Sequence, residues 1–299
     1  MRVFALMLAA CAASTLNWSA PAESAPAATA SAPAEQRLAH ISVVAMGSGS
    51  PVVLIPGLSS PRAVWDGIAP QLAARHKVYL VQVNGFGGDE PGVNLNPGVL
   101  DGIVADLHFY LAEHKAAPAR VIGHSMGGLV ALMLAKAHPG DTAAVMTVDA
   151  LPYVGAIFVP GATVAQLEPQ AKAMRDQIAA SFGKPNPGNA AVARGMALTP
   201  AAQKQIATWM GKADARVSGE AMYEDLTTDL RPDMGSITTP ITLVMPYSAA
   251  MPKERAEPFY RGEYRKTPNL TVVPVADSGH FVMLDQPKAF AAAVEQFVR

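Results

Sequence analysis

The 299-residue sequence has one cysteine, few aromatic residues (6%) and few charged residues (16%). The single cysteine, Cys11, lies in the N-terminal segment, so a mature chain that loses this segment has no disulfide and no thiol chemistry. The net charge is −1, and acidic and basic residues are mixed along the chain. A nucleic-acid-binding protein usually carries a basic stripe, so we predict no nucleic-acid partner.

The sequence also lacks the motifs that hold nucleotides or metals. It contains no phosphate-binding loop, no dinucleotide fingerprint, no H-E-x-x-H pair and no cysteine cluster. We therefore expect no cofactor and no metal. Beyond the first residues, no apolar run reaches the roughly 20 residues that span a bilayer, so we predict no integral membrane segment after the signal is removed.

Residues 1–36 resemble a secretory signal followed by a disordered tether. Arg2 precedes the apolar run "VFALMLAACAA", and a stretch rich in Ala, Pro and Ser follows. Cleavage near Ala22 or Ala30 would leave a periplasmic or secreted protein. Lipidation at Cys11 is the alternative, although the ten residues before it are few for a lipoprotein signal.

The rest of the chain alternates between short β-rich runs and helix-length segments. Most of the runs are continuously apolar, which is typical of parallel strands buried on both faces. The expected strands are 51–57, 77–83, 119–123, 143–149, 241–246 and 270–275. This alternation predicts an α/β fold, a doubly wound and mostly parallel sheet.

One segment, 152–218, shows no strand pattern. It resembles several short helices separated by Pro and Gly, and we expect a helical insertion in a core formed by 37–151 and 219–299. Methionines are frequent in and near this segment, and they either line a flexible apolar pocket or fill the core. These methionines are Met174, Met196, Met210 and Met222.

Ser125 stands in the pattern G-x-S-x-G, between a β-rich run and an apolar helical run. A sharp turn from strand to helix would raise its hydroxyl above the sheet, beside a helix N-terminus that favours developing negative charge. The alternative is an ordinary helix N-cap. The context favours a nucleophile.

A serine nucleophile needs a base, and His280 is the best placed of the seven histidines. It follows the last predicted strand and precedes the final helix, and sites gather at the carboxyl ends of parallel strands. The ring of His124, the direct neighbour of Ser125, is expected to point away from the serine hydroxyl.

Five segments resemble landmarks of the α/β-hydrolase superfamily, in the family's order. They are "PVVLIPGLSSPRAVWDGIAPQL", "VQVNGFGGDEP", "VIGHSMGGLVALMLA", "TTPITLVMP" and "VADSGHFVMLDQPKAFAAAVEQFV". The resemblance implies a Ser–His–acid hydrolase, with Ser125 as nucleophile and His280 as base. It places the insertion 152–218 where the family carries its lid.

The acid departs from the family's usual pattern. Tyr247 and Ser248 stand where the resemblance leads us to expect an Asp. Asp149, at the end of the strand that follows the nucleophile's helix, is our preferred acid, because it can accept a hydrogen bond from the histidine ring there. Further candidates remain open, and they are Asp277, Asp233 and Glu254.

Two backbone N–H groups are expected to bind the oxyanion. One belongs to Met126, the residue after the nucleophile, and the other to Leu58, in the loop "IPGLSS" after the first predicted strand. Pro56 in that loop cannot donate a hydrogen bond.

We predict an exported serine hydrolase that acts on carboxylic esters, or on lactones or small amides, through an acyl-enzyme. Its partner is a small ester-like substrate. A proline-releasing peptidase and a cofactor-free perhydrolase are alternatives on the same fold. A non-catalytic binding protein that retained the fold is an alternative of another class, favoured by the missing Asp at Tyr247.

Overall fold

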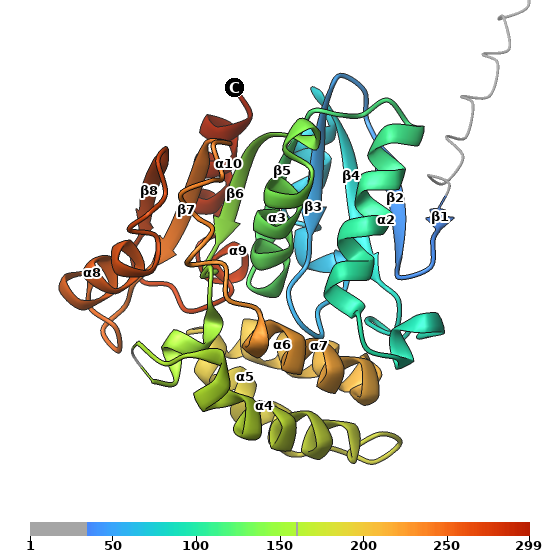
Figure 1. The fold of residues 1–299 in the computed structure, drawn as a ribbon, viewed down its shortest axis with the longest axis vertical. Helices are drawn as coiled ribbons and strands as arrows, with labels where there is room; N and C mark the ends of the chain where they lie inside the picture. The colour runs from blue at the N-terminus through green and yellow to red at the C-terminus, as the bar shows by residue number, and fades with distance from the viewer. Residues whose placement is uncertain (1–34, 160) are drawn as a thin grey trace, which may run out of the picture. The chain divides into compact units, whose positions relative to one another are not determined.

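The computed structural model describes residues 35–159 and 161–299 (Figure 1). Nearly all of the predicted signal and tether, including Cys11, therefore lies outside the described residues. Within them, eight strands form one sheet in the spatial order β1-β2-β4-β3-β5-β6-β7-β8. The strands are β1 (Glu35–Arg37), β2 (Ile41–Met46), β3 (Ser50–Ile55), β4 (His76–Val83), β5 (Ala119–His124), β6 (Thr142–Val148), β7 (Ile241–Pro246) and β8 (Leu270–Val275).

The strands from β4 to β8 in this order are parallel, and β1 and β2 add an antiparallel edge. The apolar runs are buried on both faces because successive side chains of a strand point to opposite sides. In β3, Val53 and Ile55 enter one core layer, whereas Val52 and Leu54 enter the other. The predicted α/β, mostly parallel sheet is confirmed.

Helices cover both faces of the sheet. Three helices, α2, α3 and α8, pack on one face, while α1 and α10 pack on the other, where Trp65 stacks on Phe290. The helices outside the insertion are α1 (Ala69–Ala73), α2 (Val99–Glu113), α3 (Met126–Ala137), α8 (Lys253–Glu263), α9 (Val282–Asp285) and α10 (Pro287–Val298). Short 3-10 turns lie at Arg62–Trp65, Gly92–Leu95, Pro139–Asp141 and Val154–Ile157.

The connection between β6 and β7 forms a separate group of helices, which we call the helical insertion. It contains α4 (Val164–Ala179), α5 (Gly188–Met196), α6 (Pro200–Lys212) and α7 (Ala215–Thr227). Figure 1 shows this group beyond the ends of the strands, at the bottom of the view. Local signals start two of these helices. A capping box joins Thr163 and Gln166 at α4, and Thr199 caps α6 ahead of Pro200.

The six strands predicted from the sequence are all present, within two residues of their expected ends. Three elements were not anticipated, namely β1, β2 and α7. The expected boundary at residue 218 falls inside α7, because Gly219 does not end this helix. The Gly219 backbone packs closely against α4, where an added Cβ would lie 2.7 Å from the Arg175 carbonyl oxygen.

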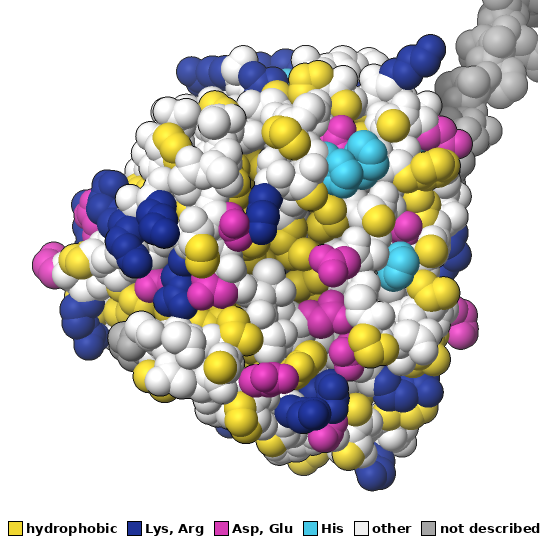
Figure 2. Space-filling view, viewed as in Figure 1, with side chains coloured by type: hydrophobic (Ala, Val, Ile, Leu, Met, Phe, Trp, Pro, Cys, Tyr) yellow, Lys and Arg dark blue, Asp and Glu magenta, His cyan; other side chains and the backbone are white. Residues whose placement is uncertain are grey.

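None of the described helices is long and apolar enough to cross a membrane. On the face drawn in Figure 2, basic and acidic side chains are interspersed, and apolar side chains lie between them. This mixture agrees with the net charge of −1.

Candidate active site

Ser125 occupies the junction between β5 and α3. Its backbone angles are φ 54° and ψ −125°, a conformation that is costly for a residue with a side chain. Its hydroxyl makes no capping hydrogen bond, so the geometry does not support an ordinary N-cap. The strained turn instead leaves the side chain at the edge of a cavity.

The small residues around Ser125 are required by close contacts between backbones. A Cβ added to Gly123 would lie 2.1 Å from the carbonyl oxygen of Gly127. A Cβ added to Gly127 would lie 2.4 Å from the carbonyl oxygen of Ile55 in β3. The pattern G-x-S-x-G is therefore a steric requirement of this turn.

Asp149 and His280 are brought together by the fold, although 131 residues separate them. His280 Nδ1 lies 2.6 Å from Asp149 Oδ2, and both side chains are partly buried. Asp149 follows β6, and its N–H donates to the Val244 carbonyl on β7. His280 lies in the loop between β8 and α9.

The other carboxylates that the sequence left open lie elsewhere. Asp233 pairs with Lys136 at 2.7 Å. Glu254 is on the first turn of α8, and Asp277 uses its carbonyl oxygen to accept a bond from Gln286. Within the described part of the chain, Asp149 is the carboxylate bonded to the His280 ring. Its catalytic role stays a prediction.

Two residues that the sequence analysis did not single out as site residues support this pair. Tyr260 of α8 donates its hydroxyl to Asp149 Oδ1, and burial together with the Asp149 charge raises the pKa of this phenol well above its usual value. His124 donates from Nε2 to the His280 carbonyl at 3.0 Å. Burial and the neighbouring His280 ring lower the pKa of His124 well below its usual value, so its ring is neutral.

Asp285 connects the histidine loop to the helical insertion. Its carboxylate accepts the N–H of Gly279 at 2.9 Å, one residue before His280. The same carboxylate accepts the N–H groups of Leu198 and Thr199, between α5 and α6. The Phe281 N–H adds a bond to the Met196 carbonyl at 3.2 Å.

The two expected oxyanion donors lie on neighbouring strands. Leu58 follows β3 and Met126 follows β5, and these strands pair in parallel with Ile55 opposite Gly123. Neither the Leu58 nor the Met126 N–H has an acceptor among the described residues. Two unoccupied donors beside a strained serine are what an oxyanion site requires, and this role stays a prediction.

A cavity of about 1570 Å³ lies between the core and the helical insertion. Ser125, His280 and Leu58 line it. The four methionines noted in the sequence also line it, so they form part of an apolar pocket wall. These methionines are Met174, Met196, Met210 and Met222.

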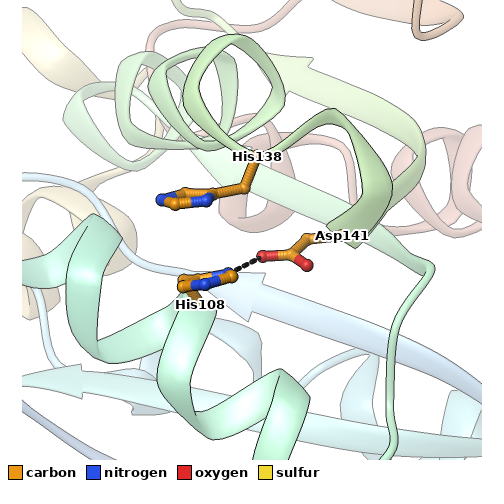
Figure 3. A group of neighbouring side chains, drawn as sticks. All are labelled: His108, His138 and Asp141. Atoms are coloured by element: carbon orange, nitrogen blue, oxygen red, sulfur yellow. Dashed lines mark hydrogen bonds and ion pairs between the residues drawn. The ribbon is translucent and has the colours of Figure 1, made fainter.

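A cluster of potential metal ligands, His108, His138 and Asp141, lies outside this cavity (Figure 3). His108 Nδ1 is 2.7 Å from Asp141 Oδ2, and the two imidazole rings stack with centroids 3.7 Å apart and an angle of 9°. A metal ion binds a histidine in the plane of its ring. Two parallel rings at this separation share no such position, so the cluster as arranged is a packing contact between α2 and the end of α3.

Parts of the chain are similar in sequence to known bacterial enzymes. One is the pimeloyl-[acyl-carrier protein] methyl ester esterase of Aeromonas hydrophila, at 38% identity over 38% of this chain and 42% of that protein. Another is the N-formylmaleamate deformylase of Pseudomonas putida, at 32% identity over 31% of this chain and 34% of that protein. The aligned part thus spans less than half the length of these relatives.

Solved structures match over most of the chain. A thermophilic esterase from Thermogutta terrifontis superimposes with a TM-score of 0.73 at 18% identity, covering 89% of this chain and 98% of the other. The enol-lactonase from Burkholderia xenovorans gives 0.69 at 17% identity, covering 86% and 96%. At these identities the likeness concerns the fold.

The alpha/beta hydrolase family model matches residues 52–293, from β3 to the final helix. The glycine-flanked serine turn, the Asp149–His280 pair and the helical insertion all lie between these bounds. The chain therefore belongs to the α/β-hydrolase family.

Proposed function

We propose that this protein is an exported serine hydrolase of carboxylic esters, with lactones and small amides as close alternatives. The observation that carries the proposal is the hydrogen bond between Asp149 and His280, because His280 lines the same cavity as the strained Ser125. The curated relatives that are named as ester or amide hydrolases support the same class of reaction.

In the proposed reaction, Ser125 Oγ attacks the carbonyl carbon of the ester while His280 Nε2 takes the hydroxyl proton. The N–H groups of Leu58 and Met126 hold the oxyanion, and each such donor is worth roughly 2.7–4 kcal/mol in other enzymes. The tetrahedral intermediate collapses, and His280 returns the proton to the departing alcohol. A water molecule, deprotonated by His280, then attacks the acyl carbon; the bond to Ser125 Oγ breaks, His280 returns the proton to Oγ, and the acid leaves.

Asp149 keeps the His280 ring in one orientation and stabilises the imidazolium. The hydrogen bond from Nδ1 directs Nε2, the other ring nitrogen, toward the cavity side. In the structure, Ser125 Oγ and His280 are not hydrogen-bonded to each other, and such contacts often tighten only when substrate binds.

A fluorophosphonate reagent tests the nucleophile directly. The wild-type protein should react at Ser125, as read by mass spectrometry of the labelled peptide, and Ser125→Ala should neither react nor hydrolyse p-nitrophenyl esters. A folded wild-type protein that does not label would indicate the non-catalytic alternative.

A pair of variants tests the assignment of Asp149 as the acid. Asp149→Asn should lower kcat by about 10³–10⁴-fold on a short p-nitrophenyl ester, because the ring loses the charged acceptor that fixes its tautomer and stabilises the imidazolium. Asp277→Asn in the neighbouring loop is the matched control and should retain activity. Full activity in Asp149→Asn would contradict the assignment.

Export is proposed from the sequence of residues 1–36. The predicted result is a periplasmic or secreted protein whose N-terminus lies near residue 22 or 30. N-terminal sequencing of the fractionated protein measures this. A full-length chain retained in the cytoplasm would contradict it.

A further inference from the structure

The wall of the cavity contributed by α7 carries a buried acid, Asp225. Ser218, Met222 and Asp225 are four and seven residues apart, so they share one face of the helix, and all three line the cavity. Asp225 is 6% exposed. The proposed chemistry at Ser125 does not use this carboxyl group.

Asp225 differs from the two partly buried acids of the cavity wall, Asp214 and Asp89, because it has no partner among the described residues. Asp214 pairs with Arg216 at 2.6 Å, and Asp89 pairs with Arg37 at 3.5 Å. Within 35–159 and 161–299, no side chain forms a hydrogen bond or ion pair with the Asp225 carboxylate, and only burial and the charge of His280 act on its pKa.

Burial without a partner disfavours the charged form of the Asp225 carboxyl group. Desolvation raises the pKa of Asp225 to about 7, although the nearby His280 acts in the opposite direction. Buried polar groups in folded proteins are nearly always bonded, so an unpaired buried carboxyl group in a cavity wall needs an explanation, and a ligand can supply the partner.

Two anchors hold α7 in place against the core. Glu224 accepts the N–H groups of Gly98, Val99 and Leu100 at the start of α2, at 2.5–3.0 Å. On the cavity side, Ser59 Oγ lies 2.8 Å from Ser218 Oγ, next to the Leu58 loop. Asp225 therefore has a fixed position relative to the proposed reaction centre.

The charges on the cavity wall indicate the kind of ligand. Lys184 and Lys212 are exposed at the rim, and Arg216 is engaged by Asp214 and lies over the Phe182 ring at 3.7 Å. The unpaired buried charge in the wall is thus acidic, and Met222, three residues before it in α7, lines the same cavity.

We propose that Asp225 is a specificity-determining residue that binds an ammonium group of the substrate, so that the enzyme prefers esters carrying a positively charged nitrogen. This inference rests on the proposed ester hydrolysis. A carboxylate in an apolar wall gains most from a cationic partner, because desolvation strengthens the interaction between the charges.

Matched pairs of esters test the proposal. On the acyl side, β-alanine methyl ester is compared with methyl butanoate, and on the alcohol side, acetylcholine is compared with 3,3-dimethylbutyl acetate. Within each pair the cationic group replaces an apolar group of similar shape. For at least one pair, wild-type kcat/KM should favour the cationic ester, and Asp225→Asn should reduce this value about 10–100-fold.

The neutral ester of that pair should change by no more than about twofold in Asp225→Asn. Glu90→Gln is the matched control, because Glu90 is an exposed acid of the same cavity rim, and it should leave both values unchanged. Equal losses on both members of a pair, or no preference in the wild type, would overturn the inference while ester hydrolysis stands.

A binding measurement separates the two proposals. Titration calorimetry on Ser125→Ala should show that the cationic ester of a pair binds more tightly than the neutral ester. The double variant Ser125→Ala with Asp225→Asn should bind the two esters with equal affinity. This result supports the inference even if wild-type protein hydrolyses none of the esters, an outcome that would contradict the proposed function. Equal or undetectable binding of both members contradicts the inference.

Discussion

At the residue scale, the site depends on side chains that meet across long stretches of sequence. Ser125 and His280 are identifiable because each sits at the end of a recognisable strand, and Asp149 follows from the same rule. Tyr260 and Asp225 carry no such signal. Tyr260 meets Asp149 across 111 residues, from a helix whose position depends on tertiary packing.

Tyr260→Phe is expected to lower kcat about tenfold with little change in KM, because Asp149 loses a hydrogen bond to its charged oxygen. Steady-state kinetics on a short ester measures the effect. Tyr264→Phe is the matched control. The Tyr264 hydroxyl bonds Thr147 and the Ala150 carbonyl, so its loss should reduce stability and leave kcat nearly unchanged.

If both variants lose kcat equally, the contact with Asp149 has no specific role. A rise in KM with unchanged kcat would also contradict the prediction, since Tyr260 is expected to position the acid and not to bind substrate.

Asp225 should make stability depend on pH. Burial raises its pKa from the ordinary value of 3.8 to about 7, so the folded protein holds the proton more tightly than the unfolded chain does. Stability is therefore lost as pH rises from about 4 to 7 and stays lower above pH 7. Asp225→Asn removes this loss and should be more stable at about pH 8, by up to about 4 kcal/mol.

Urea unfolding of wild type and Asp225→Asn at several pH values measures this difference. The advantage of the variant should shrink as pH falls toward 4. A difference that is independent of pH would mean that the carboxyl group does not titrate as a buried, unpaired acid.

At the scale of elements, the buried parallel strands were predictable because burial on both faces requires continuous apolar runs. Two classes of element were not. The strands β1 and β2 form the antiparallel edge of the sheet, and β1 spans three residues. The sequence of α7 contains Gly219 and only a weak apolar pattern, so its contacts with α2 and α4 determine its extent.

Glu224 is expected to stabilise the junction between α7 and α2. Its carboxylate accepts three N–H groups that the first turn of α2 cannot satisfy internally. Glu224→Gln should reduce the free energy of unfolding by about 1–2 kcal/mol. Chemical denaturation measures this loss.

Asp101→Asn is the matched control, since Asp101 is an exposed acid in the first turn of the same helix. It should cost about 0.3–1 kcal/mol through the helix dipole alone. Equal losses in the two variants would show that direct capping by Glu224 contributes nothing.

At the scale of the whole molecule, the described chain forms a complete sheet with its cavity, and the contacts of the site come from residues after Pro33. A chain that begins at Pro33 should fold and retain kcat/KM within about twofold of the full-length protein. Parallel kinetics and thermal melts of the two proteins measure this. A large loss of activity would show that the first 32 residues contribute to the site.

The bonds of Asp285 connect the histidine loop directly to the helical insertion. The Asp285 carboxylate accepts N–H groups both from the α5–α6 junction and from Gly279, the residue before His280. A displacement of that junction would break the bonds from the Leu198 and Thr199 N–H groups to this carboxylate. A substitution that alters the helical insertion at Leu198 or Thr199 is therefore expected to disturb the loop of His280 as well, although neither residue contacts the imidazole ring through a hydrogen bond.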